Sequence, residues 1–300
     1  WSTDKENVIS GYFCFSNPLL LMKSLVESKS DFVKGLVKYN ESIPLKLESS
    51  GEWLDFGHIN SFFQSRASVT TQRAFNELKI CSRKISKSSK KNSKKLIAEG
   101  RWFSNLPLPL RLYTPTLLGF DEAGKSKNNA NYQLEYLYLL PLSDLYVFTH
   151  LSIGIWKTIF TAISGMLNDF SEYQINKQDK DIVHEINDLY LPKTLERLSE
   201  YSDSDGYDIN TLYLLGENEQ FTLIDMANQT AQFINPTRES DVMISHGDLC
   251  FSNILFDTRV ESIKCIDPRG ITPKGEYSIY GDRRYDLAKL YHSVVGLYDF

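Results

Sequence analysis

The sequence has few cysteines, and none are paired at the spacing that binds zinc. Its four cysteines are scattered over 300 residues, at Cys14, Cys81, Cys250 and Cys265. Without a CxxC motif or a closely spaced set, neither a zinc ribbon nor a disulfide-stapled extracellular scaffold is indicated. We therefore expect a cytoplasmic protein whose cysteines remain reduced.

Long apolar runs are also missing. The longest, Leu151–Leu167, is interrupted by Lys157 and is shorter than the roughly 20 residues that span a bilayer, so it predicts a buried helix and no membrane span. The chain begins with Trp1 and shows no secretory leader, and a helical pattern over residues 286–300 stops without a cap residue. We expect the sequence to be a fragment of a longer polypeptide.

Positive charge is not in excess, because the net charge is -5 and the isoelectric point is about 5.6. This balance excludes a chain that binds nucleic acid or anionic membranes over its whole surface. One local run, residues 79–95, holds eight basic side chains and no acid. A solvated loop or helix start is the usual interpretation of such a run, and contact with phosphate or nucleic acid is the alternative.

The amino-acid composition, with 42% hydrophobic and 13% aromatic residues, is typical of a folded globular chain. Residues 1–70 have a mixed α/β pattern, with a strand predicted over 9–16 and a helix over 18–28. Residues 71–140 alternate strand-like segments with one helix that ends before Pro107. Residues 141–300 are mainly helical. These three ranges are the predicted domains, and the predicted fold class is α+β.

A short segment with several polar residues, HGDLCFSNILFD at 246–257, lies between strand-like sequences. A second strand-like sequence follows and ends at Asp267. If the two strands form an antiparallel hairpin with its turn near Val260, residues whose numbers sum to about 520 face each other. Asn253 and Asp267 satisfy this sum, so an amide oxygen and a carboxylate are expected side by side at the open end of the hairpin.

These residue types suit one kind of chemistry. Hard oxygen ligands from few residues, with room for water, are typical of Mg²⁺ that carries substrate phosphates. Asp248 lies in the loop that leads to the same end, where a carboxylate can accept the proton of an attacking hydroxyl. The alternative is that these residues only shape a turn between two strands. Asp257 is assigned to that turn, and His246 to the support of the loop.

The pattern HGD, then Asn253 five residues after Asp248, then the ID ending at Asp267, resembles the aminoglycoside phosphotransferase and choline kinase-like family of small-molecule kinases. The resemblance implies a bilobal protein-kinase-like fold, with a small antiparallel-sheet lobe and a larger helical lobe. It also implies ATP and Mg²⁺ as cofactors, Asp248 as the catalytic base, and Asn253 and Asp267 as metal ligands. Asp286, in YDLAKL, matches a family aspartate that supports the catalytic loop.

The same resemblance implies nucleotide-binding residues upstream. Lys87 would reach the ATP phosphates and pair with Glu99 on a helix, with Lys84 as the rival for the lysine role and surface placement of both side chains as the alternative. Glu135 and Leu137 would present backbone groups to adenine. No glycine-rich GxGxxG occurs between residues 76 and 87, so the loop over the phosphates departs from the kinase pattern.

Arginine residues near the end of the chain are a further departure. Arg269 follows the ID motif, and Arg283 and Arg284 precede Asp286. They can pair with an anionic acceptor or form surface salt bridges. Both interpretations stay open from sequence alone.

The first seventy residues carry a separate resemblance. WLDFGH at 53–58 is similar to a segment of sugar-phosphate nucleotidyltransferases in which the aspartate helps to hold a metal, which implies that role for Asp55. The glycine-rich loop of that family is missing from this chain. Residues 1–70 would then be the C-terminal part of such a domain, and a chance similarity is the alternative.

Together these patterns predict an ATP- and Mg-dependent kinase that phosphorylates a hydroxyl of a sugar, polyol or amino alcohol. The fusion with a nucleotidyltransferase-like segment suggests a precursor for capsule or other surface polysaccharide. The alternatives are a nucleotidyltransferase with an auxiliary kinase-like part, and a non-catalytic pseudokinase. Nucleotide and a small-molecule substrate are the expected partners, and nucleic acid is not.

Overall fold

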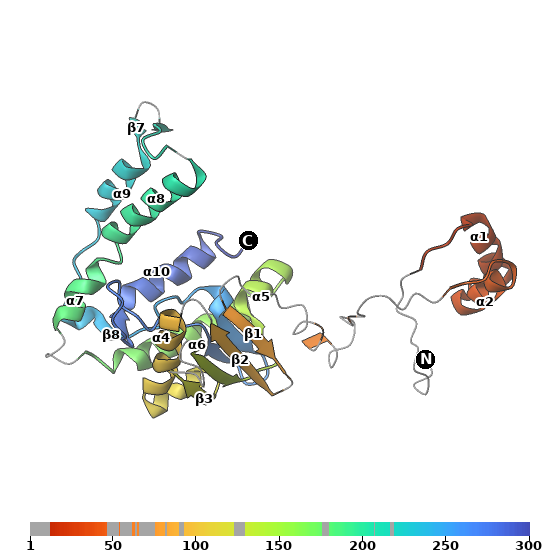
Figure 1. Cartoon of the computed structure of the whole chain (residues 1–300), viewed down its shortest axis with the longest axis horizontal. Helices are drawn as coiled ribbons and strands as arrows, with labels where there is room; N and C mark the ends of the chain where they lie inside the picture. The colour runs from red at the N-terminus through yellow and green to blue at the C-terminus, as the bar shows by residue number, and fades with distance from the viewer. Residues whose placement is uncertain are drawn as a thin grey trace. The chain divides into compact units, whose positions relative to one another are not determined.

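The computed structural model describes residues 13–46, 54, 62–63, 65, 76–81, 83–89, 93–122, 130–175, 180–206, 208–216 and 219–300. The chain divides into two compact units, Trp1–Arg66 and Ala67–Phe300, which are described separately below and drawn in Figure 1. The sequence placed the corresponding boundary at residue 70. Asp55 and most of the WLDFGH segment lie outside the described residues.

The described part of the first unit contains two helices, α1 (Pro18–Glu27) and α2 (Phe32–Ser42). Asn17 caps α1 by accepting the backbone N–H of Leu20 at 3.0 Å, which satisfies one of the free N–H groups at the helix start. The helix predicted over 18–28 is thus confirmed. The strand predicted over 9–16 is wrong in its described part, because residues 13–16 are irregular. An isolated strand has no neighbour to bond its backbone, and none lies beside this segment among the described residues.

The second unit begins with a four-stranded antiparallel sheet in the order β1-β2-β4-β3. Its strands are β1 (Asn76–Ile80), β2 (Lys84–Ser89), β3 (Leu117–Asp121) and β4 (Asn131–Glu135). Helix α4 (Ser93–Asn105) follows β2 and packs against the sheet, as Figure 1 shows. The predicted helix ending before Pro107 is confirmed. The strand-like pattern of the sequence continues over residues 131–140, but β4 stops at Glu135, where the segment leaves the sheet.

Three shorter antiparallel sheets complete the strand content of the described residues. They pair β10 with β9 and β9 with β5, β11 with β8, and β6 with β7. Their bounds are β5 (Leu140–Pro141), β6 (Tyr213–Leu215), β7 (Glu219–Phe221), β8 (Val242–Ile244), β9 (Ile254–Asp257), β10 (Ser262–Cys265) and β11 (Tyr280–Asp282). The unit therefore has a mixed α+β architecture with small antiparallel sheets.

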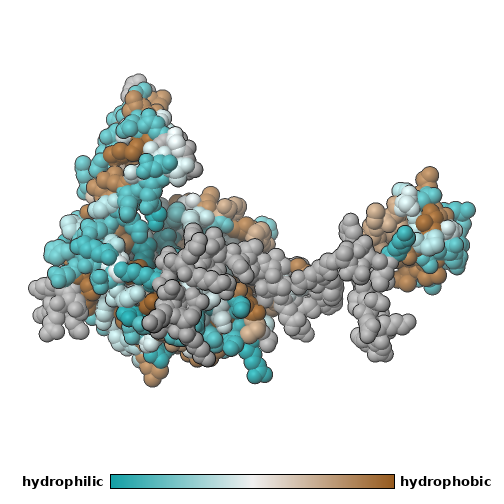
Figure 2. Space-filling view, viewed as in Figure 1, coloured by the Kyte–Doolittle hydropathy of each residue, from teal (hydrophilic) through white to brown (hydrophobic). Residues whose placement is uncertain are grey.

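Helices dominate the chain after residue 141, as the sequence predicted. They are α5 (Leu142–Phe148), α6 (Ile153–Ser171), α7 (Lys180–Asn187), α8 (Leu191–Asp205), α9 (Leu223–Ala231) and α10 (Arg283–Val294). Short 3₁₀ turns lie at Glu239–Asp241 and Phe251–Asn253, and another lies earlier in the chain, at Leu108–Tyr113. Helices α8 and α9 lie side by side, with the β6–β7 ribbon at their far end (Figure 1). In Figure 2 this part of the surface shows apolar side chains among hydrophilic ones.

Helix α6 corresponds to the long apolar run of the sequence. Its buried face consists of Ile159, Ile163, Met166 and Phe170, but Ile153 at its start is 75% exposed. The predicted buried helix is therefore confirmed along the stripe of α6 that faces the core, and the start of the helix is exposed. Among the described residues, no helix has both the length and the apolar character needed to cross a membrane.

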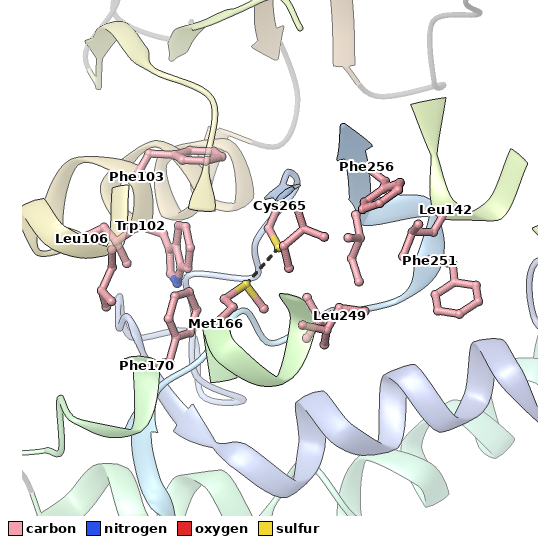
Figure 3. Packing of buried hydrophobic residues seen from close by; sticks show 14 of the residues in the cluster. Trp102, Phe103, Leu106, Leu142, Met166, Phe170, Leu249, Phe251, Phe256 and Cys265 are labelled. Carbon is pink, nitrogen blue, oxygen red and sulfur yellow. Dashed lines mark hydrogen bonds between the residues drawn. The ribbon is translucent and has the colours of Figure 1, made fainter. Parts of the chain in front are cut away.

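The core of the second unit joins α4 and α6 to the segment around β9 and β10 (Figure 3). Trp102 of α4 is 1% exposed, and its indole N–H donates to the backbone oxygen of Ser245 at 2.8 Å. Cys265 of β10 lies against Met166 of α6, with 3.4 Å between the sulfur atoms. Burial of these large side chains stabilises the unit and holds the 245–253 loop against α4.

Candidate active site

The loop that carries HGD is held by the carboxylate of Asp286 in α10. The backbone N–H groups of His246 and Gly247 donate to the two oxygens of this carboxylate at 2.8 Å each. Asp286 is 1% exposed, and burial raises its pKa above the ordinary value even though the loop and nearby charges favour the ionised form. The buried carboxylate thus supplies two fixed acceptors that set the path of the loop.

His246 supports the loop from inside the core. Its Nδ1 accepts the backbone N–H of Asp248 at 3.3 Å, so Nδ1 is unprotonated. Its Nε2, 2.9 Å from the backbone oxygen of Ile266, must then carry the proton and donate it. Burial lowers the pKa of His246, against the opposing influence of Asp286 and Asp248. A neutral imidazole with both nitrogens bonded to backbone positions the segment and is not available for proton transfer.

Asp248 is the carboxylate of the loop that reaches solvent, with 40% of its side chain exposed. The side-chain amide of Asn253 donates to the backbone oxygen of Asp248 at 2.8 Å, and Lys289 lies 2.8 Å from Asp248 Oδ1. Burial raises the pKa of Asp248, but the hydrogen bond and charge of Lys289, with smaller effects of His246 and Arg269, lower it below the ordinary value. The carboxylate is therefore ionised at neutral pH and able to accept a hydrogen bond.

Lys289 was not among the residues predicted from sequence. It follows Asp286 by three residues in α10, so the two side chains lie on the same side of the helix. Its ammonium also lies over the ring of Tyr298, 5.4 Å from the centroid. The only signal in the sequence is this spacing, and spacing alone does not show that the lysine reaches a loop some forty residues earlier.

Asn253 and Asp267 lie at the open end of the β9–β10 hairpin, but their register differs from the prediction. Cys265 faces Ile254, and the backbone N–H of Ile266 donates to the oxygen of Asn253 at 3.0 Å. Asn253 therefore faces Ile266, and Asp267 comes one residue later. A shift of one residue in a regular strand would turn the side chain to the other face. Asp267 has φ of +56°, so the chain has left the regular strand at this point.

Lys87 of β2 brings the upstream segment to Asp267. Its ammonium lies 2.6 Å from Glu99 Oε2 of α4 and 3.1 Å from Asp267 Oδ1. The hydroxyl of Tyr132 donates to the same Glu99 oxygen at 2.7 Å. Burial lowers the pKa of Lys87, but the negative charges of Asp267 and Glu99 raise it above the ordinary value. Burial also raises the pKa of Glu99, and Lys87 opposes this shift.

Lys84, the rival of Lys87, has a different environment. It lies at the start of β2, is exposed, and donates to the side-chain oxygen of Gln133 at 3.2 Å. Lys87 is 9% exposed and is the one that touches Glu99 and Asp267. Side chains separated by 180 residues in the sequence thus meet at one point.

The residues present fit a Mg²⁺ ion that keeps water and phosphate ligands. The Nδ2 of Asn253 is bonded to the Asp248 backbone, which leaves its amide oxygen as the group able to bind a cation. Asp267 uses Oδ1 for Lys87, and its other oxygen can bind a metal. Within the described residues, no cluster of three or more His, Cys, Asp or Glu side chains forms a metal site. One carboxylate and one amide are the small protein set that Mg²⁺ uses when phosphates supply further ligands.

The predicted adenine-binding residues lie where β4 ends. The backbone N–H of Glu135 donates to the oxygen of Thr116 at 2.9 Å, and its carboxylate accepts from the Thr116 hydroxyl at 2.8 Å. Glu135 thus joins β4 to the segment before β3. Leu137 lies two residues on, half-buried, in the irregular segment between β4 and β5.

The three arginines have distinct environments. Arg284 donates to Asp282 at 2.5 Å and to the backbone oxygen of Asn235 at 2.9 Å, so it forms a structural ion pair. Arg283 is exposed. Arg269 bonds its backbone N–H to the oxygen of His246 at 2.9 Å and therefore lies directly against the HGD loop.

Asp282 was also missed from sequence, although it orients α10. It is fully buried, caps α10 through the backbone N–H of Arg284 at 2.8 Å, and accepts from the hydroxyls of Tyr190 at 2.7 Å and Thr237 at 2.8 Å. Burial raises the pKa of Asp282, but the bonds from Arg284, Tyr190 and Thr237 lower it below the ordinary value.

We expect Asp282→Asn to reduce the free energy of unfolding by about 3 kcal/mol at pH 7, because it leaves Arg284 without its buried partner. A lowered folded-state pKa means that Asp282 stabilises the protein above about pH 4, the ordinary range of the group. This contribution is lost as the pH falls through the folded-state pKa. The difference from the unchanged protein should therefore shrink below about pH 4 in urea unfolding series.

The control for this substitution is Asp225→Asn, at the exposed capping box of α9. It should change the free energy of unfolding much less. Equal losses in the two variants, or a loss for Asp282→Asn that does not depend on pH, would contradict the role assigned to the buried carboxylate.

The description of the site rests on this chain alone. No family model matches this chain, and a search of curated proteins finds no match to it.

Proposed function

We propose that this chain is an ATP- and Mg-dependent phosphotransferase that acts on a hydroxyl group of a small metabolite. The proposal rests on one observation: the ammonium of Lys87 lies 2.6 Å from Glu99 Oε2 and 3.1 Å from Asp267 Oδ1. Asn253 lies at the open end of the adjacent hairpin. A lysine held by a helix glutamate beside a metal-binding aspartate is the phosphate-handling part of a kinase. The proposed fold is the bilobal kinase-like one, with residues 71–140 and 141–300 as its lobes.

Each residue has a role that follows from its environment. The ammonium of Lys87, kept charged by Glu99 and Asp267, would bind the phosphates of ATP. The carboxylate of Asp248 would orient the acceptor hydroxyl and accept its proton. The hydroxyl oxygen would bond to the γ-phosphorus while the bond from this phosphorus to the bridging oxygen breaks and ADP leaves. Asn253 and Asp267 would hold Mg²⁺, which neutralises charge on the transferred phosphoryl group. The adenine base would bind beside Glu135 and Leu137. The carbonyl oxygen of Glu135 would accept a hydrogen bond from adenine, because the N–H of Glu135 is already bonded to Thr116.

The wider assignments are also proposals. The protein would act in the cytoplasm and supply a phosphorylated precursor for surface polysaccharide. The nucleotidyltransferase alternative depends on Asp55, and the pseudokinase alternative requires that the site be inactive. ADP release in the presence of ATP, Mg²⁺ and a panel of sugars, polyols, amino alcohols and hydroxy acids separates these cases, since only the kinase forms ADP in proportion to phosphorylated acceptor.

Lysine substitutions test the phosphate site directly. We expect Lys87→Met to lower kcat/KM for ATP by about 10²–10³-fold, because it removes a fixed positive charge from the transferring phosphates. Lys84→Met removes an exposed lysine three residues away on the same strand and should change kcat/KM less than about 3-fold. Steady-state kinetics with ATP as the varied substrate give both values. Equal losses in the two variants would refute the assignment of Lys87.

A further inference from the structure

The side of the site next to Asp248 is rich in positive charge. Lys289 lies against Asp248, Arg269 lies against the HGD loop, and Lys193 stands in the first turn of α8. In the proposed reaction this is the side on which an acceptor hydroxyl must approach, so these charges bear on the identity of the acceptor.

The guanidinium of Arg269 is positioned by Gly247 and Tyr285, and one of its nitrogens is buried without a hydrogen-bond partner among the described residues. Its Cβ would lie only 2.8 Å from a Cβ added at Gly247, so the stem packs against the loop beside Asp248. Its guanidinium lies over the ring of Tyr285 at 4.8 Å from the centroid, and Nη2 donates to the Tyr285 hydroxyl at 3.0 Å. Nη1 is buried and has no hydrogen-bond partner within the part of the chain that the structure describes. A buried charged donor left unbonded is costly, which indicates that a ligand normally supplies the missing acceptor.

A small cavity adjoins this arginine. It has a volume of about 20 Å³, and Arg269, Gly247, Tyr285 and Leu189 are among the residues that line it. A space of this size holds about one water molecule or one ligand oxygen atom. The planar guanidinium is suited to bind an oxygen of a carboxylate or phosphate there.

Lys193 extends the same positive region. Burial and the neighbouring charges of Arg269 and Arg197 lower its pKa, whereas Glu196 and Asp248 act in the opposite direction. Lys193 therefore lies within the field of both Arg269 and Asp248. Contact between the rings of Tyr190, just before α8, and Tyr285, at 6.4 Å between centroids, brings the start of this helix to the start of α10.

The basic side chains of this region differ in whether an acid is paired with them. Lys289 pairs with Asp248, Lys87 with Glu99 and Asp267, and Arg197 with Glu200 at 2.5 Å. Over the described ranges, no carboxylate forms an ion pair with Arg269 or Lys193. A cationic acceptor would meet repulsion here, whereas an anionic one would supply the missing partner.

We propose that the acceptor is an anionic metabolite, whose carboxylate or phosphate group binds Arg269 and Lys193 while its hydroxyl meets Asp248. This inference rests on the proposed phosphotransfer. It narrows the acceptor class, because amino alcohols and other cationic acceptors are excluded and uncharged polyols are expected to be poor substrates. Carboxylate and phosphate share the recognition chemistry, and the experiment separates them.

The test compares matched acceptors with the full chain, ATP and Mg²⁺. One series is glycerol, glycerate, glycerol 3-phosphate and ethanolamine, and a second is glucose, glucuronate, glucose 6-phosphate and glucosamine. We expect an anionic member to have the highest kcat/KM of its series. Higher activity for the carboxylate than for the phosphate, or the reverse, identifies the group. A neutral or cationic member with the highest kcat/KM would overturn the proposal.

Two substitutions test whether Arg269 and Lys193 cause the preference for anionic acceptors. Arg269→Met and Lys193→Met should each raise KM for the anionic acceptor by about 10- to 100-fold, as expected for loss of a charge-assisted hydrogen bond, with KM for ATP unchanged. Arg197→Met is the matched control, because Arg197 is on the same helix as Lys193 but is exposed and paired with Glu200. Equal KM for the anionic acceptor in the unchanged protein and in both site variants would overturn the assignment.

A binding measurement distinguishes failure of this inference from failure of the kinase proposal. If no acceptor is phosphorylated, the proposed function fails, and thermal stabilisation by glycerate, glucuronate and the two phosphate esters is then compared with that by glycerol and glucose. Stabilisation by an anionic probe that is lost in Arg269→Met still supports an anion site. If no anionic probe stabilises the protein more than its neutral counterpart, or if Arg269→Met and Arg197→Met respond alike, the anion site is refuted. Circular dichroism of each variant shows whether it is folded.

Discussion

Replacement of Asp248 by Asn should lower kcat by about 10²–10⁴-fold, the range associated with loss of a general base. KM for ATP should change little, because Lys87 and Asp267 remain in place. The amide can still accept a hydrogen bond from a hydroxyl, but it cannot take up the proton. The measurement is steady-state turnover with the best acceptor, together with nucleotide binding by fluorescence titration.

The structure explains why this carboxylate is suited to the role. Lys289 keeps it ionised, Asn253 holds its backbone, and 40% of its side chain is exposed to an incoming acceptor. His246 is neutral and bonded on both nitrogens, so it offers no alternative base on the loop. We therefore do not expect a neighbouring side chain to replace Asp248 as the proton acceptor.

The matched control for Asp248→Asn is Asp257→Asn. Asp257 ends β9, and its ion pair with Arg259 at 3.2 Å lies in the hairpin turn. This substitution removes the same charge from the same hairpin and should leave kcat within about 2-fold. Unchanged turnover in Asp248→Asn, or an equal loss in both variants, would show that the proton acceptor lies elsewhere.

The second large effect is expected at Gly270, three residues after Asp267. Its φ is +63°, and a Cβ added there would lie 2.2 Å from the backbone oxygen of Ala98 in α4. That oxygen belongs to the residue before Glu99, so the helix cannot yield without moving the partner of Lys87. We expect Gly270→Ala to reduce the free energy of unfolding by about 3–4 kcal/mol, the sum of left-handed strain and overpacking.

Gly206→Ala separates these two causes. Gly206 also has φ of +63°, but apart from its two chain neighbours no atom of the described residues lies within 4 Å of an added Cβ. This variant should lose only the strain, about 1–2 kcal/mol. Unfolding by urea gives both values. If the two variants are equally destabilised, the close approach between α4 and the segment after Asp267 makes no contribution. Gly270→Ala should in addition raise KM for ATP, and Gly206→Ala should not.

Local elements were predictable where short-range physics decides them. The α1 helix is confirmed because Asn17 and Pro18 start it by capping and fixed φ, and α4 is confirmed because a helical pattern is followed by Pro107. The β9–β10 hairpin is confirmed because two apolar runs flank a polar turn. The strand at 9–16 failed in its described part, since strand formation depends on partners that a local pattern does not reveal.

The candidate site was only partly predictable. Asp248, Asn253 and Asp267 are close in sequence, and their spacing was sufficient to select them. Lys87 and Glu99 were selected by resemblance, with Lys84 as a rival that sequence could not remove. Lys289 and Asp282 were missed because they have partners at least forty positions away, Asp248 for Lys289 and both Tyr190 and Thr237 for Asp282. Pairing across such distances depends on how helices pack.

By itself, the sequence determined the α+β class, the positions of several helices and strands, and the polar residues of the HGD segment, because these follow from caps, periodicity and spacing along the chain. Only the tertiary structure decided that Lys87, rather than Lys84, meets Glu99 and Asp267, that Asn253 faces Ile266, and that Arg269 lies against the HGD loop. The physical reason is that burial selects one arrangement of distant segments. Charge pairing, register and left-handed turns are then set by that arrangement.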